Sequence, residues 1–150
     1  MPIHSFKESN WKLLEKYYEA SGYNAFSDYP TRAFWLNIYE KYPDAFFILS
    51  VRQSAEVWRN SAAIYFAKRG TEVNLEKWQK DHVRINGEIE DHFAGIPNAN
   101  FLKIVIDDGT DNGSKIKSFL AVESDAKLEI LNAASPNEYR DSDTYLPAQS

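Results

Sequence analysis

The chain has 150 residues, no cysteine and a formal net charge of −5. Its length and its 43% hydrophobic content are those of one globular domain, and we expect a single domain over residues 1–150. The lack of cysteine excludes disulfides and cysteine-ligated zinc or iron–sulfur sites. The acidic charge argues against a nucleic-acid partner, which would need Lys and Arg gathered on one face.

The sequence gives no sign of export or of membrane insertion. Residues 1–10 lack the apolar segment of a secretory signal, and no run of about 18 apolar residues occurs anywhere in the chain. We therefore expect a cytoplasmic protein without a membrane partner.

Two helices are predicted before the first strand. Asn10 is placed to cap a helix that ends near Ser21. The second helix begins at Pro30 or Thr31 and ends before Pro43. Their apolar residues recur at helical spacing, so one face of each helix is expected to pack on a core.

A buried strand is predicted at residues 46–51, where FFILSV runs without polar alternation. Ser54 follows as the N-cap of a helix. A longer helix begins at Thr71 or Asn74 and ends before Pro97.

The rest of the chain predicts a second buried strand at residues 101–106 and a turn at 107–113. A short helix at 114–122 and a polar tail at 135–150 complete the pattern. Two buried strands joined through helices predict an α/β fold with a parallel sheet flanked by helices.

Several of these segments carry a family pattern. FSDYP stands at residues 26–30, where 25–28 are predicted as a short extended segment, and KYPDAFFILSVRQSAEVWRNS stands at 41–61. The pattern resembles the P-loop sulfotransferase family, whose members carry a Y-P-x-A turn, a strand ending in V-R and a helix that supplies a serine. Ser61 lies nine residues beyond Arg52, a spacing similar to that of the bacterial branch. With IKSFLAV at 116–122, the resemblance covers about residues 26–122.

The resemblance implies a three-layer α/β fold of the P-loop NTPase type, in shortened form. It implies sulfuryl transfer from 3′-phosphoadenosine 5′-phosphosulfate (PAPS) to a hydroxyl or amine of a small-molecule or carbohydrate acceptor. It assigns Arg52 and Ser61 to the 3′-phosphate of PAPS. It assigns Asp28, two residues before Pro30, to the general base.

The residues themselves allow two interpretations of Arg52. A guanidinium at the carboxyl end of a buried parallel strand lies where open α/β sheets bind ligands, and its fork suits a phosphate. Alternatively, Arg52 pairs with a carboxylate such as Glu56, and Ser61 hydrogen-bonds its own helix.

Asp28 likewise has two interpretations. Partial burial beside Phe26 and Tyr29 would favour its action as a base. Alternatively, Asp28 caps the helix that begins at Thr31.

The sequence also departs from the family pattern. The residues before Asp28 contain one glycine, Gly22, and no strand followed by the Gly-rich loop that binds the 5′-phosphosulfate. The G-x-x-G-x-x-K segment of some branches is also missing. Two alternatives to an active enzyme therefore stay open: a non-catalytic binding or assembly module, or one chain of a complex whose partner supplies the loop. A homodimer or strand exchange would cover the sheet edges left by the missing strand.

The remaining candidates predict no metal site. His82 lies on the apolar stripe of the long helix, which is typical of a core histidine. Asp107, Asp108 and Asp111 miss the spacing of an EF-hand loop, so we expect a solvated turn there.

Overall fold

The computed structural model describes residues 8–28 and 30–123, so the predicted polar tail at 135–150 lies outside the described residues. The chain divides into two compact units, Met1–Ala45 and Phe46–Ser150. None of the helices in the described ranges is both long enough and apolar enough to cross a membrane.

The first unit is helical in its described part. It contains α1 (Glu8–Ser21), the 3₁₀ helix η2 (Thr31–Phe34) and α2 (Trp35–Lys41). Its core consists of Leu14, Tyr18 and Phe34, and the hydroxyl of Tyr18 lies 2.7 Å from that of Thr31. Both predicted helices are present, although the second begins as a 3₁₀ turn. The predicted cap of the first helix is wrong, because α1 begins at Glu8 and Asn10 lies within it. The extended segment predicted at 25–28 is not a strand, because no described strand pairs with it.

The second unit has the predicted alternation of strands and helices. Its elements are β1 (Phe47–Val51), α3 (Ala55–Lys68), α4 (Leu75–Ala94), β2 (Phe101–Val105) and α5 (Asn112–Leu120). The two strands are parallel, with Phe47 opposite Phe101 and Val51 opposite Val105. The α/β class and the parallel pairing are therefore confirmed, whereas the three-layer arrangement stays a prediction.

Side-chain caps fix where the helices of this unit begin. Ser54 accepts a hydrogen bond from the backbone N–H of Val57, as predicted. Asn74 caps α4 in the same way, which decides between the two predicted starts, Thr71 and Asn74. The predicted start of α5 at Ser114 is wrong by two residues. Asp111 is the N-cap there, and its carboxylate accepts the N–H of Ser114 at 3.0 Å.

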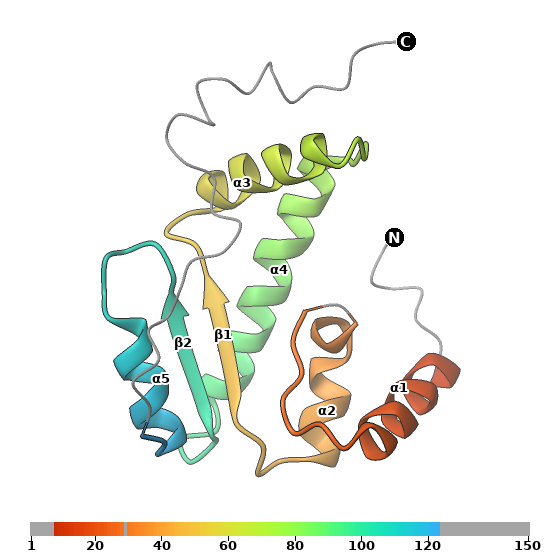
Figure 1. Ribbon diagram of the computed structural model, residues 1–150, viewed down its shortest axis with the longest axis vertical. Helices are drawn as coiled ribbons and strands as arrows, with labels where there is room; N and C mark the ends of the chain where they lie inside the picture. The colour runs from red at the N-terminus through yellow and green to blue at the C-terminus, as the bar shows by residue number, and fades with distance from the viewer. Residues whose placement is uncertain (1–7, 29, 124–150) are drawn as a thin grey trace. The chain divides into compact units, whose positions relative to one another are not determined.

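Helices lie on both sides of the strand pair (Figure 1). Phe93 of α4 stacks on Phe101 with ring centroids 4.4 Å apart and also contacts Phe47. On the other side, the buried Asn112 of α5 donates a hydrogen bond to the carbonyl of Val105 at 2.7 Å. Because the strands are parallel, their carboxyl ends meet at one edge of the sheet.

β1 pairs along one of its two edges in the described part of the chain. The N–H of Phe47 donates to the carbonyl of Asn100 at 2.8 Å, and the carbonyl of Val51 accepts from Ile106 at 3.0 Å. Since backbone groups alternate in direction along a strand, those of Ile48 and Ser50 point away from β2. Among the described residues the sheet has no third strand on that side.

Candidate functional site

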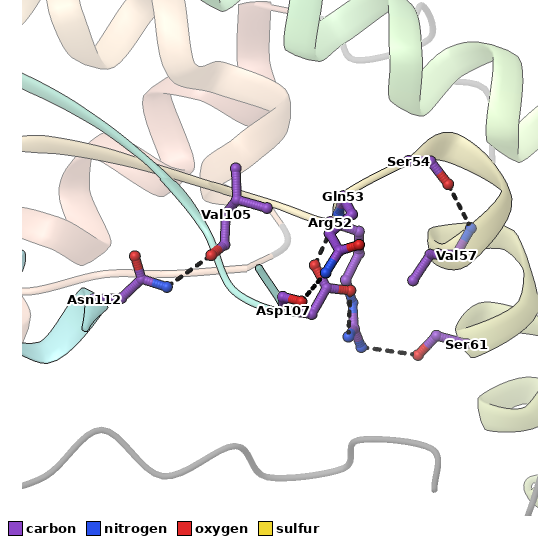
Figure 2. A network of polar contacts seen from close by, with 8 residues as sticks. All are labelled: Arg52, Gln53, Ser54, Val57, Ser61, Val105, Asp107 and Asn112. Atoms are coloured by element: carbon purple, nitrogen blue, oxygen red, sulfur yellow. Dashed lines mark hydrogen bonds and ion pairs between the residues drawn. The ribbon is translucent and has the colours of Figure 1, made fainter. Parts of the chain in front are cut away.

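Arg52 follows directly after β1 and lies between side chains of α3 and of the turn after β2 (Figure 2). Its Nη2 donates to the Oγ of Ser61 on α3 at 3.0 Å, and its Nη1 lies 3.4 Å from Oδ2 of Asp107, which follows β2. Only 17% of the Arg52 side chain is exposed, so this guanidinium is held in a largely buried place. The structure thus brings together the two residues predicted for the 3′-phosphate.

The predicted alternative for Arg52 is correct in kind but wrong in its partner. Arg52 does pair with a carboxylate, yet that carboxylate belongs to Asp107, whereas Glu56 is exposed in the first turn of α3. Ser61 accepts a hydrogen bond from Arg52.

Asp107 was not recognised as a site residue from the sequence. Its Oδ1 accepts the backbone N–H of Gln53 at 2.8 Å, and the side-chain amide of Gln53 donates to the Asp107 carbonyl. Its carboxylate therefore joins the ends of β1 and β2. The signal that could have identified it is position, because Asp107 follows the second parallel strand at the same sheet edge as Arg52.

The predicted solvated turn is confirmed for Asp108 and Asp111, which are exposed, and is wrong for Asp107, which is partly buried; hydrogen bonds also order the turn. Asp108 accepts hydrogen bonds from both the backbone N–H and the hydroxyl of Thr110, and these bonds lower its pKa. The pKa of Asp111 is lowered by the hydrogen bonds from Ser114. No group of three or more His, Asp or Glu residues in the described ranges is placed to hold a metal ion.

Arg52 also lines a cleft of about 330 Å³ within the second unit. The end of β1, the start of α3 and one side of α4 bound it, and Lys103 of β2 and Glu90, which form an ion pair at 2.9 Å, also line it. Gly87, in the middle of α4, leaves space in its wall. The other lining residues are Val51, Ser54, Ala55, His82, Val83, Asn86 and Asp91.

His82 is only partly buried, which corrects its interpretation as a core residue. Its ring stacks on Trp58 with centroids 4.2 Å apart, and its Nε2 lies 3.2 Å from the side-chain nitrogen of Asn86. The histidine therefore lies at the wall of the cleft rather than inside the core.

Asp28 lies in the first unit, and Arg52 and Ser61 lie in the second. Asp28 is exposed, so the partial burial expected of it is wrong. Its backbone has a φ of 64°, and its backbone carbonyl, not its carboxylate, accepts a hydrogen bond from the backbone N–H of Arg32 at 3.0 Å. The predicted cap is also wrong, because Pro30 stands at the N-cap of η2 without a side-chain bond.

Arg32 interacts electrostatically with Asp28. Burial lowers the pKa of the Arg32 guanidinium, and the negative charge of Asp28 opposes this shift. The role of Asp28 as a general base stays a prediction.

Comparison with known proteins gives one family match. A family model described as a sulfotransferase domain matches residues 4–115, a range that includes Arg52, Ser61 and Asp107. No curated protein and no solved structure matches the chain. The family match covers most of the chain and confirms the resemblance predicted from the motifs. The chain belongs to the sulfotransferase domain family.

Proposed function

We propose that this protein binds PAPS and transfers its sulfuryl group to a hydroxyl or amine acceptor, with Arg52 and Ser61 binding the 3′-phosphate. One observation carries the proposal. In a chain of the sulfotransferase family, Nη2 of Arg52 lies 3.0 Å from Oγ of Ser61 at the carboxyl edge of two parallel strands.

The geometry supports anion binding at Arg52. A guanidinium presents paired N–H donors that match two phosphate oxygens, and such charge-assisted bonds are stronger in a partly buried place than in water. Ser61 accepts a hydrogen bond from one nitrogen of the guanidinium, and its hydroxyl is within reach of a phosphate oxygen bound to Arg52. The two side chains therefore act as one phosphate-binding pair.

The cleft beside Arg52 supports the binding of a small molecule. Its volume of about 330 Å³ falls at the lower end of the range for ligand pockets, roughly 300–1,000 Å³. Part of the nucleotide or a small acceptor fits such a space. We propose a small-molecule or carbohydrate acceptor.

The proposed transfer is a displacement at sulfur. The acceptor O–H or N–H loses its proton to a base, for which we propose Asp28, and the freed electron pair forms a bond to sulfur. The bond between sulfur and the bridging oxygen of the 5′-phosphate breaks. Adenosine 3′,5′-bisphosphate (PAP) leaves with that oxygen.

The first test is a calorimetric titration of the full chain with PAP. We expect micromolar binding that weakens at least about tenfold in Arg52→Ala, because a charge-assisted pair is lost. Arg59→Ala, which removes an exposed arginine from the same helix as Ser61, is the matched control and should bind as the original chain does. Equal affinity in Arg52→Ala, with the fold verified by circular dichroism, would reject the site.

A second candidate function is a non-catalytic module in which Arg52 is structural. The observation in its favour is that Arg52 already has polar partners in Asp107, after β2, and Ser61, on α3. In that case PAP at millimolar concentration should not bind. Arg52→Ala should then lower the free energy of unfolding by about 1–3 kcal/mol, because the partly buried Asp107 loses its counter-ion.

A partner chain that supplies the Gly-rich loop is the remaining alternative to an enzyme that acts alone. Sulfuryl transfer would then appear only after the partner is added. The PAP titration separates this case from the structural one, since the 3′-phosphate pair would still bind.

A further inference from the structure

Two hydrogen-bond donors at the end of β1 are suited to bind an anion, and both already contact a carboxylate of the protein itself. The Arg52 guanidinium meets Oδ2 of Asp107 at 3.4 Å, and the backbone N–H of Gln53 donates to Oδ1 of the same carboxylate at 2.8 Å. Figure 2 shows both contacts beside the bond from Arg52 to Ser61. Each carboxylate oxygen thus has one donor from the end of β1.

A guanidinium together with a backbone N–H is also how proteins bind two oxygens of a phosphate. The Asp107 carboxylate has two oxygens at a similar separation but carries one negative charge rather than two. We propose that Asp107 competes with phosphate for these groups and that an incoming 3′-phosphate displaces it. This inference rests on the proposed function of Arg52.

The proposal makes Asp107 a specificity-determining residue. A ligand gains the contacts to Arg52 and Gln53 only by expelling a carboxylate that already makes them. A phosphate monoester, with about two charges near neutral pH, outcompetes that carboxylate, whereas a singly charged anion gains little by the exchange. The site therefore selects doubly charged phosphate groups.

The turn that carries Asp107 is built to allow the exchange. Asp107 follows β2, and its side chain is only 21% exposed while it remains on Arg52. Gly109, two residues on, is exposed and has a φ of 78°, so the chain reverses there without side-chain packing. Rotation of the Asp107 side chain toward solvent requires no change in the strand pairing.

The test is Asp107→Asn in the full chain, titrated with PAP and with inorganic phosphate. Asparagine keeps an oxygen for the Gln53 N–H but removes the competing charge, so we expect PAP to bind about tenfold more tightly. Asp108→Asn is the matched control: it makes the same charge change one residue away, at a side chain bonded to Thr110. It should change the affinity less than twofold.

A second measurement does not depend on the folding of a variant. In the original chain, PAP should shift the Gln53 backbone amide resonance strongly, because its acceptor changes from carboxylate to phosphate. An unmoved Gln53 resonance in a chain that binds PAP would overturn the inference.

The outcomes separate this inference from the proposed function. If the original chain binds PAP and Asp107→Asn binds it equally or more weakly, Asp107 is only structural and the proposed function stands. If Asp108→Asn strengthens binding as much as Asp107→Asn, the effect is one of net charge and the inference fails. If neither the original chain nor Asp107→Asn binds PAP, both proposals fail.

Discussion

Gly87 is an unusual residue for the middle of a helix, where glycine costs about 1 kcal/mol relative to alanine. A Cβ added at this position of α4 meets no atom within 4 Å. We expect Gly87→Ala to raise the free energy of unfolding by about 1 kcal/mol, as measured by urea denaturation.

The matched control for this substitution is Gly70→Ala. Gly70 lies just after α3 with a φ of 62°, a conformation that a side chain strains, so the same change should lower stability by about 1 kcal/mol. A loss of stability in Gly87→Ala would contradict the open space assigned to the wall of the cleft.

At the level of single residues, the sequence predicts what is local. Arg52, Ser54 and Ser61 belong to one strand, turn and helix, so their spacing alone places them together. Asp107 stands 55 residues from Arg52, and no local pattern indicates which carboxylate meets the guanidinium. Asp28 was misjudged as a cap because a positive φ, which cannot be read from the sequence, presents its carbonyl instead.

Between elements, the edge of β1 that pairs with no strand in the described ranges leads to a prediction for hydrogen exchange. The backbone N–H groups of Phe47, Leu49 and Val51 point toward β2, whereas those of Ile48 and Ser50 point away from it. In a dilute sample we expect Ile48 and Ser50 to exchange much faster than their neighbours, as measured by nuclear magnetic resonance.

The dependence of this exchange on protein concentration tests whether a second copy of the chain covers the edge. If Ile48 and Ser50 become protected as the protein concentration rises, a second copy adds a strand to β1, which is the homodimer or strand exchange that the sequence predicts. Protection that is already complete at low concentration would contradict an open edge in the monomer.

The elements themselves were the most predictable part of the fold. FFILSV and FLKIVI are rich in β-favouring residues, with Ser50 and Lys103 as their polar positions, and Ser54 and Asn74 are good caps, so the strands and two helix starts follow from local chemistry. The predicted start of α5 is two residues late because the turn-favouring Asn112 and Gly113 belong to the helix that Asp111 caps. The number of strands beside β1 depends on contacts between distant segments, which local patterns do not encode.

For the whole molecule, the family follows from motifs that lie in both units. FSDYP belongs to the first unit, and the segment around Arg52 belongs to the second. The family match extends from residue 4 to residue 115 and so includes parts of both. The family pattern is therefore a property of both units rather than of the strand pair alone.

The parallel pairing also sets the order in which the second unit folds. Gln53 and Asp107 are 54 residues apart, and α3 and α4 lie between them, so the two strand ends meet only after a long loop closes. The Arg52–Asp107 contact is then expected to form after the folding transition state. In stopped-flow experiments Asp107→Asn should speed unfolding and leave the folding rate nearly unchanged. A slower folding rate would show that this contact forms early, and the protein's lifetime in the folded state would then depend on other contacts.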